Sequence, residues 1–164
     1  MIVSLNEIET AAYRAALGVG LDHGLAQDAG AIAVKLVPSR PDGLAILLRA
    51  LNFADANRIA PPVFVREGRH FRPRHAVLPS LVAGPIAADL RRAEPDAAVD
   101  TSRADEPAIV ELCLSPPAGN APDHGVAVTG GLWQDLQRLA ARTYVPASET
   151  SRLMGAGAGL RDTD

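Results

Sequence analysis

The stretch SLNEIETAAYRAALGVG, residues 4–20, decides the character of the fold. Its first four residues fit the capping box, in which a serine oxygen accepts from an amide of the first turn and a glutamate accepts from the serine amide. Glycines at 18 and 20 close the pattern. From Leu5 to Val19, apolar side chains recur at helical spacing, at Leu5, Ile8, Ala12, Ala15 and Val19. The stretch predicts a short amphipathic helix that begins at Ser4.

The next two segments repeat this periodicity. One ends before Pro38, and the other follows the turn Pro41-Asp42-Gly43. Their apolar positions are Leu25, Ala29, Ile32, Ala33 and Leu36, and then Leu44, Leu47, Leu48 and Leu51. Residues 1–55 are therefore predicted to form a helical N-terminal segment of three helices.

Residues 56–146 have the pattern of a sheet-containing core. Val63–Val65 and Arg69–Arg72 flank Glu67-Gly68, which predicts a hairpin. Further strands are predicted at Val77–Val82, Ala108–Leu114 and Gly125–Thr129, with a short helix at Pro85–Ala93 and exposed loops at 94–107 and 115–124. A last helix has the apolar stripe Trp133, Leu136, Leu139 and Ala140.

These elements predict an α+β fold. An N-terminal helical segment is expected to pack beside a small, mainly antiparallel sheet that carries the one C-terminal helix. The chain has 164 residues, of which 48% are hydrophobic and 21% charged, which suits a single domain over 1–164. Residues 147–164 form a Gly/Ala-rich tail.

Composition excludes several classes of protein. A net charge of -3 lacks the cationic excess of general nucleic-acid binders. The most apolar stretch, Leu78–Ala88, is too short for a membrane span and is interrupted by two prolines. The single cysteine and the absence of an export signal at the start predict a cytoplasmic protein. Arginine supplies 15 of the 16 basic residues, which indicates a GC-rich bacterial genome.

The densest charge feature is the predicted hairpin, residues 66–75, where four arginines and two histidines surround one glutamate. Arginine pairs bidentately with carboxylate or phosphate, so a small anion is the candidate ligand. A solvated surface hairpin is the alternative. RNA ranks third, because Phe71 is the only aromatic residue of the patch. The anion-binding candidates are Arg66, Arg69, His70, Arg72 and Arg74.

Glu111 and Cys113 are the weak catalytic candidates. Strand alternation would place both on one face of Ala108–Leu114, where the carboxylate could act as a base or the thiol as a nucleophile. Glu111 in solvent and Cys113 as a small hydrophobe is the alternative. Since no histidine signature accompanies the cysteine, this alternative is favoured, and the chain is more readily interpreted as a non-enzyme.

No metal and no cofactor are expected. His70 and His75 are five residues apart, a spacing that suits neither a helix nor a strand face, and His23 and His124 stand alone. The turn before the last helix lacks the lysine of a P-loop and the full dinucleotide pattern.

The tail offers a different kind of contact. Its glycines are costly to order, so it should become fixed only where something holds it. Leu153 and Leu160 would be apolar anchors, and Arg152 could pair with an acidic group. The tail is predicted to dock against its own domain or a neighbouring subunit.

Two stretches carry a resemblance to a known family. They are residues 3–9 together with 18–24, and the tail 144–164 with its Ser-Arg-Leu and Gly-Ala-Gly-Ala-Gly-Leu runs. Both resemble the bacterial family catalogued as domain of unknown function 3726. The resemblance implies a bacterial metabolic setting and assigns no residue a role.

The sequence therefore favours a small cytosolic accessory or interaction protein that assembles with itself or with a metabolic enzyme. The alternative is an enzyme or binder of a small anionic metabolite, a carboxylate or phosphate. Self-association is expected because the helices offer more apolar faces than one small sheet covers.

Overall fold

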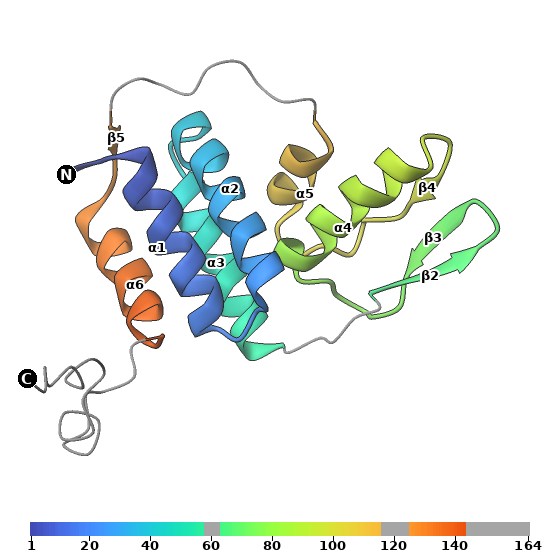
Figure 1. Cartoon of the computed structure of the whole chain (residues 1–164), viewed down its shortest axis with the longest axis horizontal. Helices are drawn as coiled ribbons and strands as arrows, with labels where there is room; N and C mark the ends of the chain where they lie inside the picture. Colours follow the sequence, from blue (N-terminus) through green and yellow to red (C-terminus); the bar gives the residue numbers. More distant parts are fainter. Residues whose placement is uncertain (58–62, 116–124, 144–164) are drawn as a thin grey trace, which may run out of the picture.

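A computed structural model describes residues 1–57, 63–115 and 125–143 (Figure 1). Within them the helices are α1 (Leu5–Gly18), α2 (His23–Ser39), α3 (Gly43–Ala56), α4 (Ser80–Ala93), α5 (Pro107–Leu114) and α6 (Gly130–Ala141). The strands are β1 (Ile2–Val3), β2 (Phe64–Glu67), β3 (His70–Pro73), β4 (Ala98–Val99) and β5 (Val126–Ala127). The predicted α+β class is confirmed. Helices α1, α2, α3 and α6 gather at one end, and the β2–β3–β4 sheet lies at the other.

The predicted start of α1 is confirmed in detail. The Glu7 amide donates to Ser4 Oγ over 3.2 Å, and the Ser4 amide donates to Glu7 Oε2 over 2.8 Å. These reciprocal bonds satisfy amides that have no partner inside the helix. Gly20, with a φ of 91°, turns the chain toward α2 in a conformation that favours glycine. The three N-terminal helices form as expected, although α2 continues through Pro38 to Ser39.

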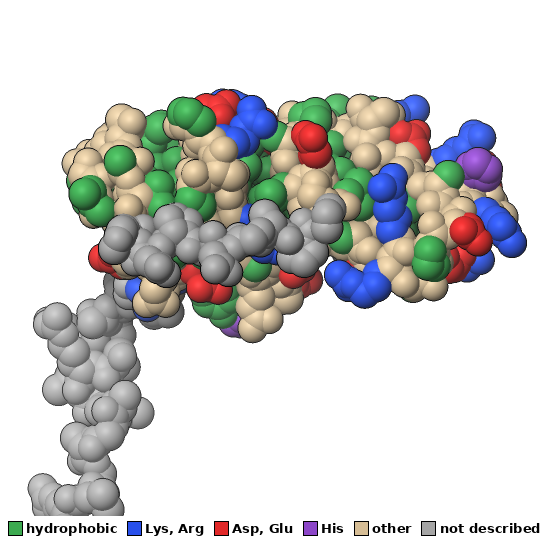
Figure 2. All heavy atoms as spheres, turned by 90° about the horizontal axis from the view of Figure 1, so that it is seen from above, with side chains coloured by type: hydrophobic (Ala, Val, Ile, Leu, Met, Phe, Trp, Pro, Cys, Tyr) green, Lys and Arg blue, Asp and Glu red, His purple; other side chains and the backbone are tan. Residues whose placement is uncertain are grey.

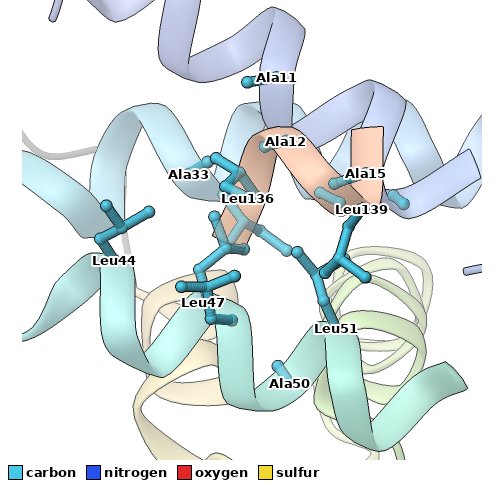
Figure 3. Close-up of a cluster of buried hydrophobic side chains, with 14 of the residues drawn as sticks. Ala11, Ala12, Ala15, Ala33, Leu44, Leu47, Ala50, Leu51, Leu136 and Leu139 are labelled. Atoms are coloured by element: carbon cyan, nitrogen blue, oxygen red, sulfur yellow. The ribbon is translucent and has the colours of Figure 1, made fainter. Parts of the chain in front are cut away.

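The larger hydrophobic cluster is built around α1. Besides Ile8, its buried face is made of small side chains, Ala11, Ala12, Ala15 and Ala16, which let α2 and α6 approach closely. Leu136 and Leu139 of α6 fill the space between this alanine face and the leucines of α3 (Figure 3). At the end of α1, a Cβ atom on Gly18 would collide with the carbonyl oxygen of Leu139. Backbone therefore meets backbone at the α1–α6 contact.

Substitution of Gly18 tests this contact. Gly18→Ala should lower the free energy of unfolding by about 1–3 kcal/mol, because the added methyl group has to push a backbone carbonyl aside. The matched control is Gly131→Ala, since a Cβ there meets nothing within 4 Å. That control should be neutral, or stabilising by up to about 1 kcal/mol, because alanine favours helix over glycine. Urea denaturation measures both, and equal effects would contradict the close contact.

The predicted hairpin is confirmed as β2 and β3, joined through Gly68 at a φ of 65°. Strand β4 extends the sheet in the order β2–β3–β4 and runs parallel to β3, so the sheet is mixed. Strands β1 and β5 form a separate antiparallel pair. Strand β5 lies within the strand predicted at 125–129. The inner face of the larger sheet packs on α4 in a second hydrophobic cluster, which includes Phe71, Val99, Val82, Ala83 and Ala87.

Two predicted strands are wrong. Ala108–Leu114 forms α5, with Pro107 at its favoured first turn and Ile109 and Val110 buried. A short, continuously apolar run fits a buried helix as well as a strand, so periodicity could not decide. In Val77–Val82 only Leu78 makes a strand-like bridge, to Ala104, and α4 begins at Ser80.

Two further expectations about helices need correction. Pro85 lies inside α4 and not at its first position, because the helix starts five residues earlier than predicted. The C-terminal helix α6 forms as predicted, but it packs on α1 and α3 and not on the sheet. Its apolar stripe of Leu136, Leu139 and Ala140 packs against the alanine face of α1.

The early start of α4 has a specific cause. Asp105 Oδ1 accepts hydrogen bonds from the Ser80 amide over 2.7 Å and from Ser80 Oγ over 2.5 Å. Ser80 Oγ in turn accepts from the Glu106 amide over 2.7 Å, at the start of α5. Asp105 thus caps the first residue of α4, and Ser80 binds the amide of Glu106, the N-cap residue of α5. Burial raises the pKa of Asp105, although the hydrogen bonds from Ser80 act in the opposite direction.

Loss of the Ser80 hydroxyl should be costly, because it leaves the half-buried Glu106 amide without this acceptor and the half-buried Asp105 carboxylate without one donor. Ser80→Ala should lower the free energy of unfolding by about 1–3 kcal/mol. Ser102→Ala is the control, since Ser102 makes the same hydroxyl-to-aspartate bond, to Asp100, in an exposed turn. Its effect should stay within about 0.5 kcal/mol. Chemical denaturation measures the change in the free energy of unfolding for both variants, and equal changes would contradict the structural role of Ser80.

None of the helices in the described parts of the chain has both the length and the apolar character that crossing a membrane requires.

Candidate functional site

A groove of about 470 Å³ lies between α3 and α6. Its α3 side is a single helical face, with Ala45, Leu48, Arg49 and Asn52 at positions i, i+3, i+4 and i+7. Its α6 side is likewise one face, formed by Leu132, Asp135, Arg138, Leu139 and Arg142. The groove is therefore lined by two helices, which contribute both leucines and charged side chains.

Three arginines give the groove its charge. Arg49 binds Glu106 through two contacts, Nε to Oε1 at 2.6 Å and Nη2 to Oε2 at 3.1 Å. Arg138 pairs with Asp135, and Arg142 with Asp55, each at 2.6 Å. A guanidinium carries five N–H donors, so each arginine keeps donors for a further acceptor. Because Glu106 belongs to the Ser80 capping arrangement, Arg49 is held by the start of α5.

The hairpin arginines are more neutralised than the sequence suggested. Three of the four pair with carboxylates, as Arg66–Glu94, Arg69–Asp96 and Arg72–Glu67. Arg66 also lies 5.6 Å from the centre of the Phe71 ring. Figure 2 shows arginines, a histidine and acidic side chains intermingled at the hairpin end. Arg74 has no ion pair with any residue in the described ranges. Glu94 and Asp96 come from the loop after α4, which local sequence patterns could not place there.

Two of the hairpin candidates nevertheless share a cavity. His70 and Arg72 line a space of about 380 Å³ together with Arg91 of α4 and Asp100. Arg91 was not among the anion-binding residues predicted from the sequence. The cavity combines two guanidinium groups and an imidazole with one carboxylate, so anion binding by the hairpin stays a prediction.

Glu111 and Cys113 do not share a face. In a helix, residues two apart point about 200° from each other, so the pairing expected from strand alternation is wrong. Glu111 is exposed, whereas Cys113 is half-buried and lines a small cavity between α2, α4 and α5. Burial, with the nearby charge of Asp28, raises the pKa of the Cys113 thiol to about 11. The thiol is therefore protonated at neutral pH and is a poor nucleophile.

The reactivity of Cys113 should follow from this environment. At pH 8 the folded protein should react with iodoacetamide at least about tenfold more slowly than the urea-unfolded chain, whose thiol has an ordinary pKa. The rate for the folded protein should still be rising at pH 10. Mass spectrometry of the alkylated product gives both rates, and rapid alkylation with a plateau below pH 8 would contradict the raised pKa.

Other candidates fall outside what the structure covers. Arg152, Leu153 and Leu160 of the tail, and His124, lie outside the described residues. Within the described ranges, no group of three or more histidine, cysteine or acidic residues could hold a metal ion.

Sequence reasoning missed the α3–α6 groove. Arg138 and Arg142 are four residues apart on a helix that was predicted, so their common face was available from the sequence. What was missing was the neighbour of that face, since the contact with α3 depends on how α6 packs against α1.

The comparisons with known proteins agree with the N-terminal resemblance. The sequence profile of the family described as "Protein of unknown function (DUF3726)" matches residues 3–121, more than half of the chain. The chain belongs to this family. The tail lies beyond the matched residues. No curated protein and no solved structure matches the chain.

Proposed function

We propose that the protein is an accessory protein of the bacterial cytoplasm that binds an acidic amphipathic helix of a partner protein in the α3–α6 groove. The observation that carries this proposal is the combination of a leucine lining with three arginines along two neighbouring helices. Helix-in-groove recognition uses apolar anchors at helical spacing, which suit such a lining.

Charge complementarity indicates the chemistry of the partner. The groove lining contains three arginines and one aspartate, and each arginine pairs with one carboxylate, that of Glu106, Asp135 or Asp55. Acidic side chains beside the apolar stripe of a bound helix would accept the guanidinium donors that the internal ion pairs leave free. A basic or neutral helix would not form these charge-assisted hydrogen bonds with the arginines.

The groove favours a partner over enzymatic chemistry. Among the described residues its lining offers no histidine and no cysteine, and the one carboxylate there, that of Asp135, is paired with Arg138. The partner is more readily another protein than a second copy, because the apolar helix faces expected to drive self-association cover one another in the core. Among the described residues, the large hydrophobic side chains that remain exposed are Met1, Ile2, Val65 and Val77.

A binding experiment with designed peptides tests the proposal. The probe is a fluorescein-labelled peptide of 18 residues, with leucines along one helical face and glutamates beside them. The control peptide has the same composition with the leucines spread evenly. Fluorescence anisotropy should show binding of the first peptide at least about tenfold tighter than the second, because only a stripe can fill the groove. Binding should weaken with added salt.

Paired variants localise the binding. Arg138→Gln/Arg142→Gln should weaken peptide binding by at least about tenfold, since two charge-assisted contacts are lost. Arg91→Gln/Arg92→Gln, at the end of α4, removes two exposed arginines away from the groove and should leave binding unchanged. Equal binding of both peptides, or equal loss in both variants, would refute the proposal. A mass above that of the monomer in light scattering, lost in the groove variant, would assign the groove to self-association instead.

One observation favours the second candidate function, binding of a small anionic metabolite. It is the cavity that brings Arg91 beside His70 and Arg72. Citrate and inorganic phosphate are suitable probes. Binding of either that is lost in Arg91→Gln but kept in Arg92→Gln, combined with no peptide binding, would select this function over the first.

A further inference from the structure

A small cavity of about 160 Å³ lies where α2, α4 and α5 meet, separate from the α3–α6 groove. Its apolar lining is Ala31 and Ile32 of α2, Pro85 and Ala88 of α4, and Leu112 and Cys113 of α5. Its volume is below the roughly 300–1,000 Å³ of pockets that hold drug-sized ligands, so its occupant has to be small.

Four charged side chains line the same cavity, two of each sign. Helix α2 contributes Asp28 and Lys35, and α4 contributes Asp89 and Arg92. Asp89 and Arg92 pair with each other, with Oδ1 and Nη1 2.5 Å apart. In the described residues, no ion pair engages Asp28 or Lys35. The two free charges of the cavity are therefore one carboxylate and one ammonium group.

The carboxylate end lacks a cation. Partial burial and repulsion from Asp89 and Asp22 raise the pKa of Asp28. Arg92 already pairs with Asp89, so it cannot fully offset this repulsion. A ligand ammonium group beside Asp28 would relieve it and would restore the solvation that the carboxylate loses by burial.

Lys35 lines the same cavity as Asp28. It follows Asp28 by seven residues on the same face of α2, a rise of about 10 Å along the helix axis. The charges of both Asp28 and Lys35 are felt at the Cys113 thiol, which places the thiol near both of them. Lys35 is also the one lysine of a chain that otherwise uses arginine. A compact ammonium suits a carboxylate at the end of a narrow cavity better than a broad guanidinium does.

We propose that this cavity binds a small zwitterion whose amine and carboxylate are separated by a short aliphatic chain. The ligand ammonium binds Asp28, its carboxylate binds Lys35, and its methylene groups contact Ile32 and Leu112. The separation of Asp28 and Lys35 along α2 favours such an ω-amino acid over an α-amino acid, whose two charges lie too close together to meet both ends.

Lys35 itself provides the reporter for the test. Because it is the only lysine, reductive ¹³C-methylation labels one side chain besides the N-terminal amine, and methylation keeps the charge. Titration with 5-aminopentanoate should give a saturable shift of the Lys35 methyl signal. Pentanoate, pentylamine and alanine each lack one feature of the proposed ligand and should bind at least about tenfold more weakly. No saturable shift at 20 mM, or equal affinity for pentanoate, would overturn the proposal.

Variants of the two charged groups complete the test, with affinities from isothermal titration calorimetry on unlabelled protein. Asp28→Asn and Lys35→Gln should each weaken 5-aminopentanoate binding by at least about tenfold, because each removes one charge contact. Both residues are exposed, and thermal unfolding verifies that the variants fold. Asp96→Asn, an exposed aspartate outside the cavity, is the control and should bind as the unaltered protein does. Unchanged affinity in Asp28→Asn or Lys35→Gln would overturn the assignment.

Discussion

The close approach of α1 to α6 is the constraint on which the rest of the structure depends. It requires the alanine face of α1 and, at Gly18, the absence of any side chain. A larger residue at this position would hold α6 away from the bundle. Because α6 is fixed against α1, its outer face stands beside α3, and the leucines and arginines of both helices border one groove.

A second constraint fixes the other half of the molecule. The Ser80, Asp105 and Glu106 hydrogen bonds hold the starts of α4 and α5 together, and Ser80 is fully buried. The Glu106 carboxylate also holds Arg49, so the same segment positions one charged side of the α3–α6 groove. The other end of α5 contributes Leu112 and Cys113 to the small cavity against α2 and α4. One short helix thus supports both candidate binding sites.

The sequence predicted those features that local patterns determine. The capping box at Ser4, the three N-terminal helices and the hairpin around Gly68 all follow from residues within one or two turns of each other. The strand prediction for α5 failed because a short run that is apolar on both sides fits a strand as well as a helix. Other predictions failed where contacts with residues distant in the sequence decide, as for the start of α4, which depends on Asp105, 25 residues away. The groove and the partners of the hairpin arginines were missed for the same reason, since their neighbours come from other helices and loops.

The central claim is that an acidic amphipathic helix binds along the groove between α3 and α6. The most direct measurement is a set of intermolecular nuclear Overhauser effects between protein with ¹³C-labelled leucine methyl groups and the unlabelled acidic peptide at saturation. The account predicts cross-peaks from the peptide to Leu48, Leu132 and Leu139, which line the groove. Cross-peaks confined to leucines of the sheet end, such as Leu90, or none at all at saturation, would contradict it.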